Sequence, residues 1–165
     1  MIRKKVAMVG AFAVGKTSLV QRFVSGIFSD RYLTTVGVRI DKKDLEVDGR
    51  LLSLILWDLQ GEDELHTVRM THLRGSAGLL FVADGTRAST LDTALRLAAE
   101  AVAQCGVLPS LLLINKCDVR DRWEVTDARL DELRAGGWQL LETSAQSGLQ
   151  VEAAFAALGR AMLRG

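Results

Sequence analysis

The amino-acid sequence predicts an α/β domain built on a mostly parallel β-sheet. Short apolar runs alternate with longer segments of helical periodicity, a pattern that is typical of strands connected by helices. One dipeptide, Asp48-Gly49, joins two strand-like segments directly. The 165 residues contain no repeat, low-complexity tract or Pro/Ser-rich linker, so we expect a single domain that spans residues 1–165.

Five apolar runs predict buried strands, and four amphipathic segments predict helices. The strands are expected at 6–10, 52–57, 78–84, 111–115 and 137–142. The helices are expected at 16–25, 89–104, 127–135 and 149–163. For the second helix we predict a capping box from Ser89 to Asp92 and an apolar face formed by Leu91, Leu95, Ala98 and Val102.

The segment "VRIDKKDLEVDGRLLSLILW" interrupts the alternation of strands and helices. Its two halves are strand-like, and Asp48-Gly49 between them is a dipeptide favoured in two-residue type I′ hairpins. One strand of the sheet should therefore run antiparallel to its neighbour.

The composition argues against nucleic-acid binding and membrane insertion. Charged residues make up 25% of the chain and nearly cancel to a net charge of +1, so no overall field attracts nucleic acid or anionic lipid. No apolar stretch approaches the roughly 18 residues of a membrane span. Ile2 stands where N-myristoylation needs glycine, and "MLRG" offers no prenylation cysteine. With Cys105 and Cys117 as the only cysteines, we expect a cytoplasmic monomer without its own membrane anchor.

The stretch "GAFAVGKT", residues 10–17, lies between a predicted strand and a predicted helix, as a phosphate-binding loop requires. Backbone N–H groups of such a loop cradle phosphates, Lys16 can reach the β- and γ-phosphates, and the Thr17 hydroxyl can bind Mg²⁺. The alternative is a glycine-rich turn without a ligand.

Three further motifs follow predicted strands. In "WDLQG", Asp58 is a candidate to hold a Mg²⁺-bound water and Gly61 to contact the γ-phosphate, although an aspartate at a strand end is more often a turn former. In "NKCD", Asp118 can accept from guanine N1–H and N2–H₂, and the Lys116 stem can lie along the base. In "ETSA", the Ala145 N–H can donate to guanine O6. Each short motif alone is compatible with an ordinary polar loop, but all four come at the carboxyl ends of predicted parallel strands, where such sheets bind ligands.

The order GxxxxGKT, DxxG, NKxD and SA resembles the Ras superfamily of small GTPases over essentially the whole chain, and residues 32–38, 47–58 and 65–80 are similar to Rab-type switch and interswitch segments. This resemblance implies a three-layer P-loop G domain with six strands and about five helices, guanine nucleotide, Mg²⁺ and two mobile switches. It also implies the roles of the candidate residues. Those for catalysis are Lys16, Thr35, Gly61 and Glu62; those for Mg²⁺ are Thr17, Thr35 and Asp58; and those for nucleotide are Gly10, Ala13, Val14, Gly15, Lys16, Thr17, Ser18, Phe28, Tyr32, Asn115, Lys116, Asp118, Ser144, Ala145 and Gln146.

The chain departs from the family pattern at several positions. Phe12 stands where the family usually has a small residue that faces the γ-phosphate, and Glu62 replaces the glutamine that orients the attacking water. An ionised glutamate can only accept hydrogen bonds and is repelled by phosphates. The stretch "EDE" has two interpretations: it contains a catalytic Glu62, or it is the solvated acidic start of a helix. Gln146 replaces a lysine, and Arg31 is the candidate arginine finger in cis, with a surface salt bridge as its alternative.

Two functions of different class remain. The first is a GTP-hydrolysing switch whose effector, exchange factor and activating protein bind residues of about 29–40 and 59–74. The second is a GTP-loaded binding module with negligible turnover and a partner surface that includes Trp57, Leu65, His72 and Leu73. "NKCD" and "ETSA" argue against a P-loop small-molecule kinase, and His66 and His72 have no partners at metal-ligand spacing.

Overall fold

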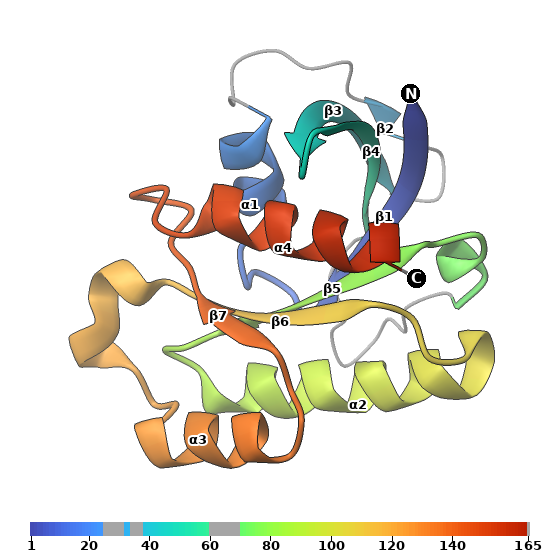
Figure 1. Ribbon diagram of the computed structural model, residues 1–165. Coiled ribbons are helices and arrows are strands. Elements are labelled where there is room, and N and C mark those ends of the chain that lie inside the picture. Colours follow the sequence, from blue (N-terminus) through green and yellow to red (C-terminus); the bar gives the residue numbers. More distant parts are fainter. Residues whose placement is uncertain (25–31, 34–37, 60–69, 165) are drawn as a thin grey trace.

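The computed structural model describes residues 1–24, 32–33, 38–59 and 70–164. A seven-stranded sheet in the order β2-β3-β4-β1-β5-β6-β7 forms its centre (Figure 1). The strands are β1 (Ile2–Gly10), β2 (Tyr32–Leu33), β3 (Arg39–Val47), β4 (Arg50–Asp58), β5 (Gly78–Asp84), β6 (Ser110–Asn115) and β7 (Leu140–Glu142). The predicted mostly parallel sheet is confirmed: β4, β1, β5, β6 and β7 are parallel, and β3 is antiparallel to β4.

The predicted hairpin joins β3 and β4. Asp48 and Gly49 have φ of 51° and 77°, so both central residues occupy the positive-φ region that a type I′ turn requires. The two-residue strand β2 then pairs with the outer edge of β3 and adds one short strand to the six that the resemblance implied.

Helices cover both faces of the sheet and complete the predicted three layers. Helices α1 (Lys16–Phe23) and α4 (Val151–Arg164) lie on one face, and α2 (Ala88–Cys105) and α3 (Asp127–Ala135) lie on the other (Figure 1). Two 3₁₀ helices, η1 (Met70–Leu73) and η2 (Cys117–Arg122), complete the regular structure of the described residues. Each face buries its own apolar cluster, and the Phe23 and Phe155 rings stack 3.9 Å apart between α1 and α4.

The detailed predictions for α2 and the last strand were partly wrong. Helix α2 begins at Ala88 without a side-chain cap, so Ser89 and Asp92 form no capping box, and the Ala88 N–H donates to Glu124 instead. The buried face consists of Thr90, Leu91, Ala94, Leu97, Ala98 and Ala101, whereas Val102 is 50% exposed. Leu91 and Ala98 of the predicted face are therefore buried and Leu95 is partly buried, but apolar spacing alone could not choose between two overlapping stripes. Strand β7 begins at Leu140 rather than at residue 137, because Gly137 has a φ of 101° and ends the preceding helix.

None of the helices in the described part of the chain is both long and apolar enough to cross a membrane.

Candidate functional site

The carboxyl ends of the parallel strands gather polar residues at one edge of the sheet. Asp58 pairs in register with Met8 near the end of β1, and Asp84 pairs with Asn115 at the ends of β5 and β6. Asp58, Asp84 and Asn115 are all at least 98% buried. Two cavities open at this edge, of 580 Å³ and 390 Å³, and the loop after β1 contributes to both.

The loop after β1 encloses the predicted phosphate-binding lysine. Strands β1 and β5 approach so closely at Gly10 that a Cβ there would lie 2.4 Å from the Val82 carbonyl oxygen. The Lys16 side chain folds back under the loop, and its Nζ donates to the carbonyls of Gly10 (3.3 Å) and Ala11 (3.1 Å). Burial lowers the pKa of Lys16 to about 8, an effect that the nearby Asp58 carboxylate opposes. A buried ammonium of this kind can bind an anion.

The same loop has unusual backbone conformations at its tip. Ala13 has a φ of 61° and Gly15 a φ of 103°, and Gly15 is the N-cap of α1 without any side-chain cap. Phe12 is 63% exposed, so its side chain faces solvent. It is also one of the residues that line the 390 Å³ cavity. The loop can therefore present N–H groups inward while phenylalanine faces outward.

Two of the predicted metal ligands meet in the 390 Å³ cavity. The Thr17 hydroxyl donates to Asp58 Oδ2 at 2.5 Å, and the other carboxylate oxygen, Asp58 Oδ1, is buried without a hydrogen-bond partner among the described residues. Burial raises the pKa of Asp58, and the Thr17 hydrogen bond and the Lys16 charge oppose that rise. A hydroxyl and a carboxylate with a free buried oxygen fit a hard divalent cation such as Mg²⁺. The described residues contain no cluster of three or more His, Cys, Asp or Glu side chains suited to a metal.

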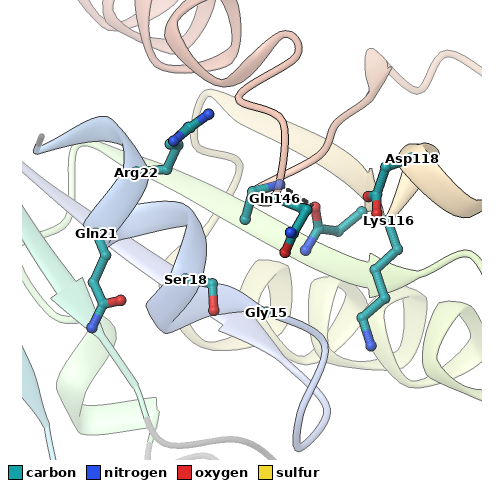
Figure 2. A pocket seen from close by; sticks show the side chains of 9 residues that line it. Gly15, Ser18, Gln21, Arg22, Lys116, Asp118 and Gln146 are labelled. Atoms are coloured by element: carbon teal, nitrogen blue, oxygen red, sulfur yellow. Dashed lines mark hydrogen bonds between the residues drawn. The ribbon is translucent and has the colours of Figure 1, made fainter. Parts of the chain in front are cut away.

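The 580 Å³ cavity brings together the predicted base-binding residues. Figure 2 shows Ser18, Gln21 and Arg22 on α1, opposite residues of the loops that follow β6 and β7. The other residues that line it are Gly15, Asn115 at the end of β6, and Lys116, Asp118, Ala145 and Gln146 in the loops after β6 and β7. The cavity thus joins the start of α1 to the "NKCD" and "ETSA" loops.

Hydrogen bonds fix the shape of these loops. Asn115 Nδ2 donates to the Val14 carbonyl at 3.0 Å and so ties β6 to the loop after β1. Ser144 Oγ donates to Asp118 Oδ1 at 2.7 Å, and the Ala145 N–H donates to Asn115 Oδ1 at 3.3 Å. The predicted motif residues are therefore neighbours, and Ser144 orients the carboxylate that would read the base.

Three residues at this site escaped the sequence analysis. Asp84 Oδ2 accepts from Lys116 Nζ at 2.8 Å and from Arg87 Nε at 3.1 Å. Trp123 Nε1 donates to the Lys116 carbonyl at 2.9 Å, which holds Lys116 at a φ of 75°. Asp84, like Asp58, is a carboxylate at the end of an apolar strand, and this pattern could have identified it as a site residue. No local sequence pattern indicates Arg87 or Trp123.

Several predictions fall on residues that the structure does not describe. Phe28, Thr35, Gly61 and Glu62 lie outside the described residues, as do Arg31, Gln60, Leu65 and His66. The backbone of Tyr32, in β2, pairs with that of Ile40 in β3.

The partner surface of the second hypothesis needs one correction. Leu73 is 1% exposed and belongs to the core, so it cannot contribute to a surface. Its burial follows from the position of η1 against the sheet, where Lys5 Nζ donates to the His72 carbonyl at 2.6 Å and lies 3.7 Å from the Trp57 ring centroid. Trp57 and His72 are partly exposed.

Comparison with known proteins agrees with this geometry. The model of the Ras family matches residues 5–164. The Ras-related protein Rab-13 of Mesocricetus auratus is 32% identical over 162 residues, which cover 96% of this chain and 79% of that protein. The Ras-related proteins Rab-8A of Bos taurus and Rab-8B of Homo sapiens are 30% and 32% identical, and each match covers 94% of this chain and 76% of the relative. The chain therefore belongs to the Ras family of small GTPases.

Proposed function

We propose that this protein is a guanine-nucleotide switch that binds GTP and GDP with Mg²⁺ and hydrolyses GTP slowly. The observation that carries the proposal is the pair of adjoining cavities. One holds a buried lysine beside a hydroxyl–carboxylate pair, and the other holds a carboxylate oriented by Ser144. Phosphates and Mg²⁺ suit the first cavity, and a purine base suits the second.

The base cavity has the chemistry to select guanine. Asp118 has only acceptors, and guanine presents two donors on one edge where adenine does not. The Ser144 hydroxyl occupies one position on Asp118 Oδ1, which leaves the remaining lone pairs for the base. A site built to hydrogen-bond a ligand rejects an analogue without matching groups by roughly 10⁴ to 10⁵. We infer that Asn115 stabilises the base site indirectly, because its side chain hydrogen-bonds to Val14 and to Ala145.

At the phosphate cavity, the Lys16 ammonium would exchange its two carbonyl contacts for the β- and γ-phosphate oxygens. Thr17 and Asp58 would hold Mg²⁺, whose charge neutralises the negative charge that develops on the phosphates during transfer. An anion beside Lys16 favours the protonated amine, and a cation beside Asp58 favours the ionised carboxylate. Ligand binding would thus shift the pKa values of both residues back towards their ordinary values.

Two positions determine the rate of hydrolysis in this proposal. Glu62 stands where a glutamine orients the attacking water, and an ionised carboxylate lacks the donor that such a glutamine offers to the phosphate. The exposed Phe12 ring stands at the mouth of the phosphate cavity, on the route by which an activating protein would insert an arginine. These residues favour the alternative of a long-lived GTP-bound module in which turnover is negligible.

For either function we propose a cytoplasmic monomer that presents its bound nucleotide to effectors, an exchange factor and an activating protein through residues of about 29–40 and 59–74. The candidate catalytic residues Thr35, Gly61 and Glu62 fall inside these ranges. Contacts that exist only with the triphosphate would then alter the surface that the effector reads.

A single-turnover experiment tests the proposal. Purified protein is loaded with radiolabelled GTP and Mg²⁺, with ATP as the control for base selection, and conversion to GDP is followed in the wild type, Glu62→Ala, Glu62→Gln and Phe12→Gly. Slow conversion that collapses in Glu62→Ala identifies a hydrolysing switch that uses Glu62. Retained GTP that is converted only in Glu62→Gln or Phe12→Gly identifies the binding module. Failure of the wild type to retain GTP contradicts both functions.

A further inference from the structure

A continuous chain of polar contacts links the base cavity to the outer turn of the phosphate loop. Lys116 Nζ lies 2.8 Å from Asp84 Oδ2, and Arg87 Nε lies 3.1 Å from the same oxygen. Arg87 Nη2 then donates to the Phe12 carbonyl at 2.9 Å. Phe12 and Arg87 are 75 residues apart in sequence, so only the parallel pairing of β1 with β5 brings these groups together.

Asp84 is the centre of this chain and is rigidly held. Its carboxylate is 1% exposed and accepts from the Thr86 backbone N–H at 2.9 Å and from the Thr86 hydroxyl at 2.7 Å. Burial raises the pKa of this carboxyl, but the hydrogen bonds from Lys116, Thr86 and Arg87 outweigh that effect and hold its pKa below the usual value. A buried carboxylate with this many donors stays ionised and keeps its partners in place.

The backbone around Asp84 leaves little room for movement. The Asp84 N–H donates to the Thr90 hydroxyl at 2.8 Å, and the Gly85 carbonyl accepts from the N–H groups of Glu124 and Val125. A Cβ at Gly85 would lie 2.1 Å from the Trp123 ring, whose Nε1 donates to the Lys116 carbonyl. Asp84 is therefore fixed both to the start of α2 and to the loop after β6.

Arg87 transmits this rigidity to the phosphate loop. The planar guanidinium presents Nε to Asp84 and Nη2 to the Phe12 carbonyl at the same time, from two nitrogens that it holds in a fixed fork. Its contact fixes the peptide that precedes Ala13, and Ala13 has a left-handed φ of 61°, a conformation that alanine adopts only at an energetic cost. The hydrogen bond opposes relaxation of the turn towards an ordinary backbone conformation.

We propose that Arg87 and Asp84 are positioning residues that couple the base loop to the phosphate loop and thereby slow nucleotide release. This inference rests on the proposed nucleotide-binding function, and neither residue belongs to the motifs that led to that function. When Arg87 is lost, the turn at Phe12 and Ala13 loses its external support, so the loop should open more often and release bound GDP faster.

The test measures release of a fluorescent GDP analogue from the wild type, Arg87→Gln, Arg87→Lys and Asp84→Asn, together with the midpoint of thermal unfolding of each nucleotide-free protein. Arg96→Gln is the matched control, because Arg96 lies in α2, its side chain is exposed to a similar degree, and it pairs with Glu100. We expect release from Arg87→Gln to be about 5- to 20-fold faster than from the control, which corresponds to about 1–2 kcal/mol for the loss of one partly exposed hydrogen bond.

Arg87→Lys separates positioning from simple stabilisation. A lysine keeps a positive charge beside Asp84 but lacks the fixed fork that spans Asp84 and the Phe12 carbonyl, so we expect its unfolding midpoint to match the wild type and its release rate to match Arg87→Gln. Combining Asp84→Asn with Arg87→Gln should accelerate release no more than Asp84→Asn alone, because both act along one chain of contacts.

The inference is overturned if Arg87→Gln releases the analogue within twofold of Arg96→Gln, or if Arg87→Lys restores the wild-type rate. Because Arg87 is partly exposed, its variants should fold, and their release rates test the inference even if the variant of the buried Asp84 fails to fold. A wild type that binds no guanine nucleotide overturns the proposed function as well as this inference. A wild type that binds while Arg87→Gln behaves as the control overturns the inference alone.

Discussion

Gly15 cannot become alanine without disturbing the contact that joins the phosphate loop to the base loop. A Cβ at Gly15 would lie 2.3 Å from Asn115 Nδ2, which donates to the Val14 carbonyl at 3.0 Å. The displaced amide is 2% exposed and loses its acceptor, at a cost of about 1–3 kcal/mol. The left-handed φ of 103° adds about 1–2 kcal/mol for any residue with a Cβ.

Gly137 provides a matched control. It has a φ of 101°, and a Cβ there meets nothing within 4 Å. Gly137→Ala should therefore show the backbone cost alone, and the gain from a stiffer unfolded chain is the same at both positions. We expect Gly15→Ala to lower the free energy of unfolding by about 1–3 kcal/mol more than Gly137→Ala, since only Gly15 disturbs the amide.

Urea denaturation of the nucleotide-free proteins measures this difference. The double variant Gly15→Ala with Asn115→Ala adds a second test: once the amide is absent, the further cost of Gly15→Ala should fall to that of Gly137→Ala. Equal destabilisation by the two glycine variants, or a full extra cost that persists without Asn115, would refute the assignment of this contact.

Three further predictions concern the lysine, the core and a helix cap. The pKa of buried Lys16 is about 8 in the folded protein and 10.5 in the unfolded chain, so the unfolded chain binds more protons between pH 8 and 10.5. The free energy of unfolding should therefore rise with pH in this range, by up to about 3 kcal/mol. Urea denaturation from pH 8 to 10 should show this rise in the nucleotide-free wild type and not in Lys16→Met. Phe155→Ala removes the ring that stacks on Phe23 and should cost about 3–5 kcal/mol in the same assay, and a cost below 1 kcal/mol would contradict the core described above. Thr126→Ala should cost about 1 kcal/mol because the Thr126 hydroxyl caps α3, whereas Thr93→Ala, in the interior of α2, should change stability little. Thermal unfolding compares this last pair, and equal midpoints would contradict the cap.

The elements that the sequence predicted correctly depend on local chemistry. Asp48 and Gly49 form the expected turn because both tolerate positive φ, whatever packs around them. Gly10, Lys16 and Asn115 lie where the motifs placed them because continuous apolar runs define the strands and parallel strands end at one edge. The face of α2 was predicted correctly at Leu91 and Ala98 but wrongly at Val102, since apolar residues lie on two adjoining stripes and only contact with the sheet selects between them.

The sequence by itself determined the α/β class, the hairpin, the order of the motifs and the family resemblance, because each depends on spacing along a few consecutive residues. The tertiary structure decided which distant side chains meet. The register of β5 and β6 sets Asp84 beside Asn115, and that placement lets Asp84 bind both Lys116 and Arg87. It also buried Leu73, which sequence reasoning had placed on the surface. Side-chain contacts between separate strands and loops depend on sheet register and packing, and the continuous apolar runs of β5 and β6 contain no alternation that would fix which residues pair.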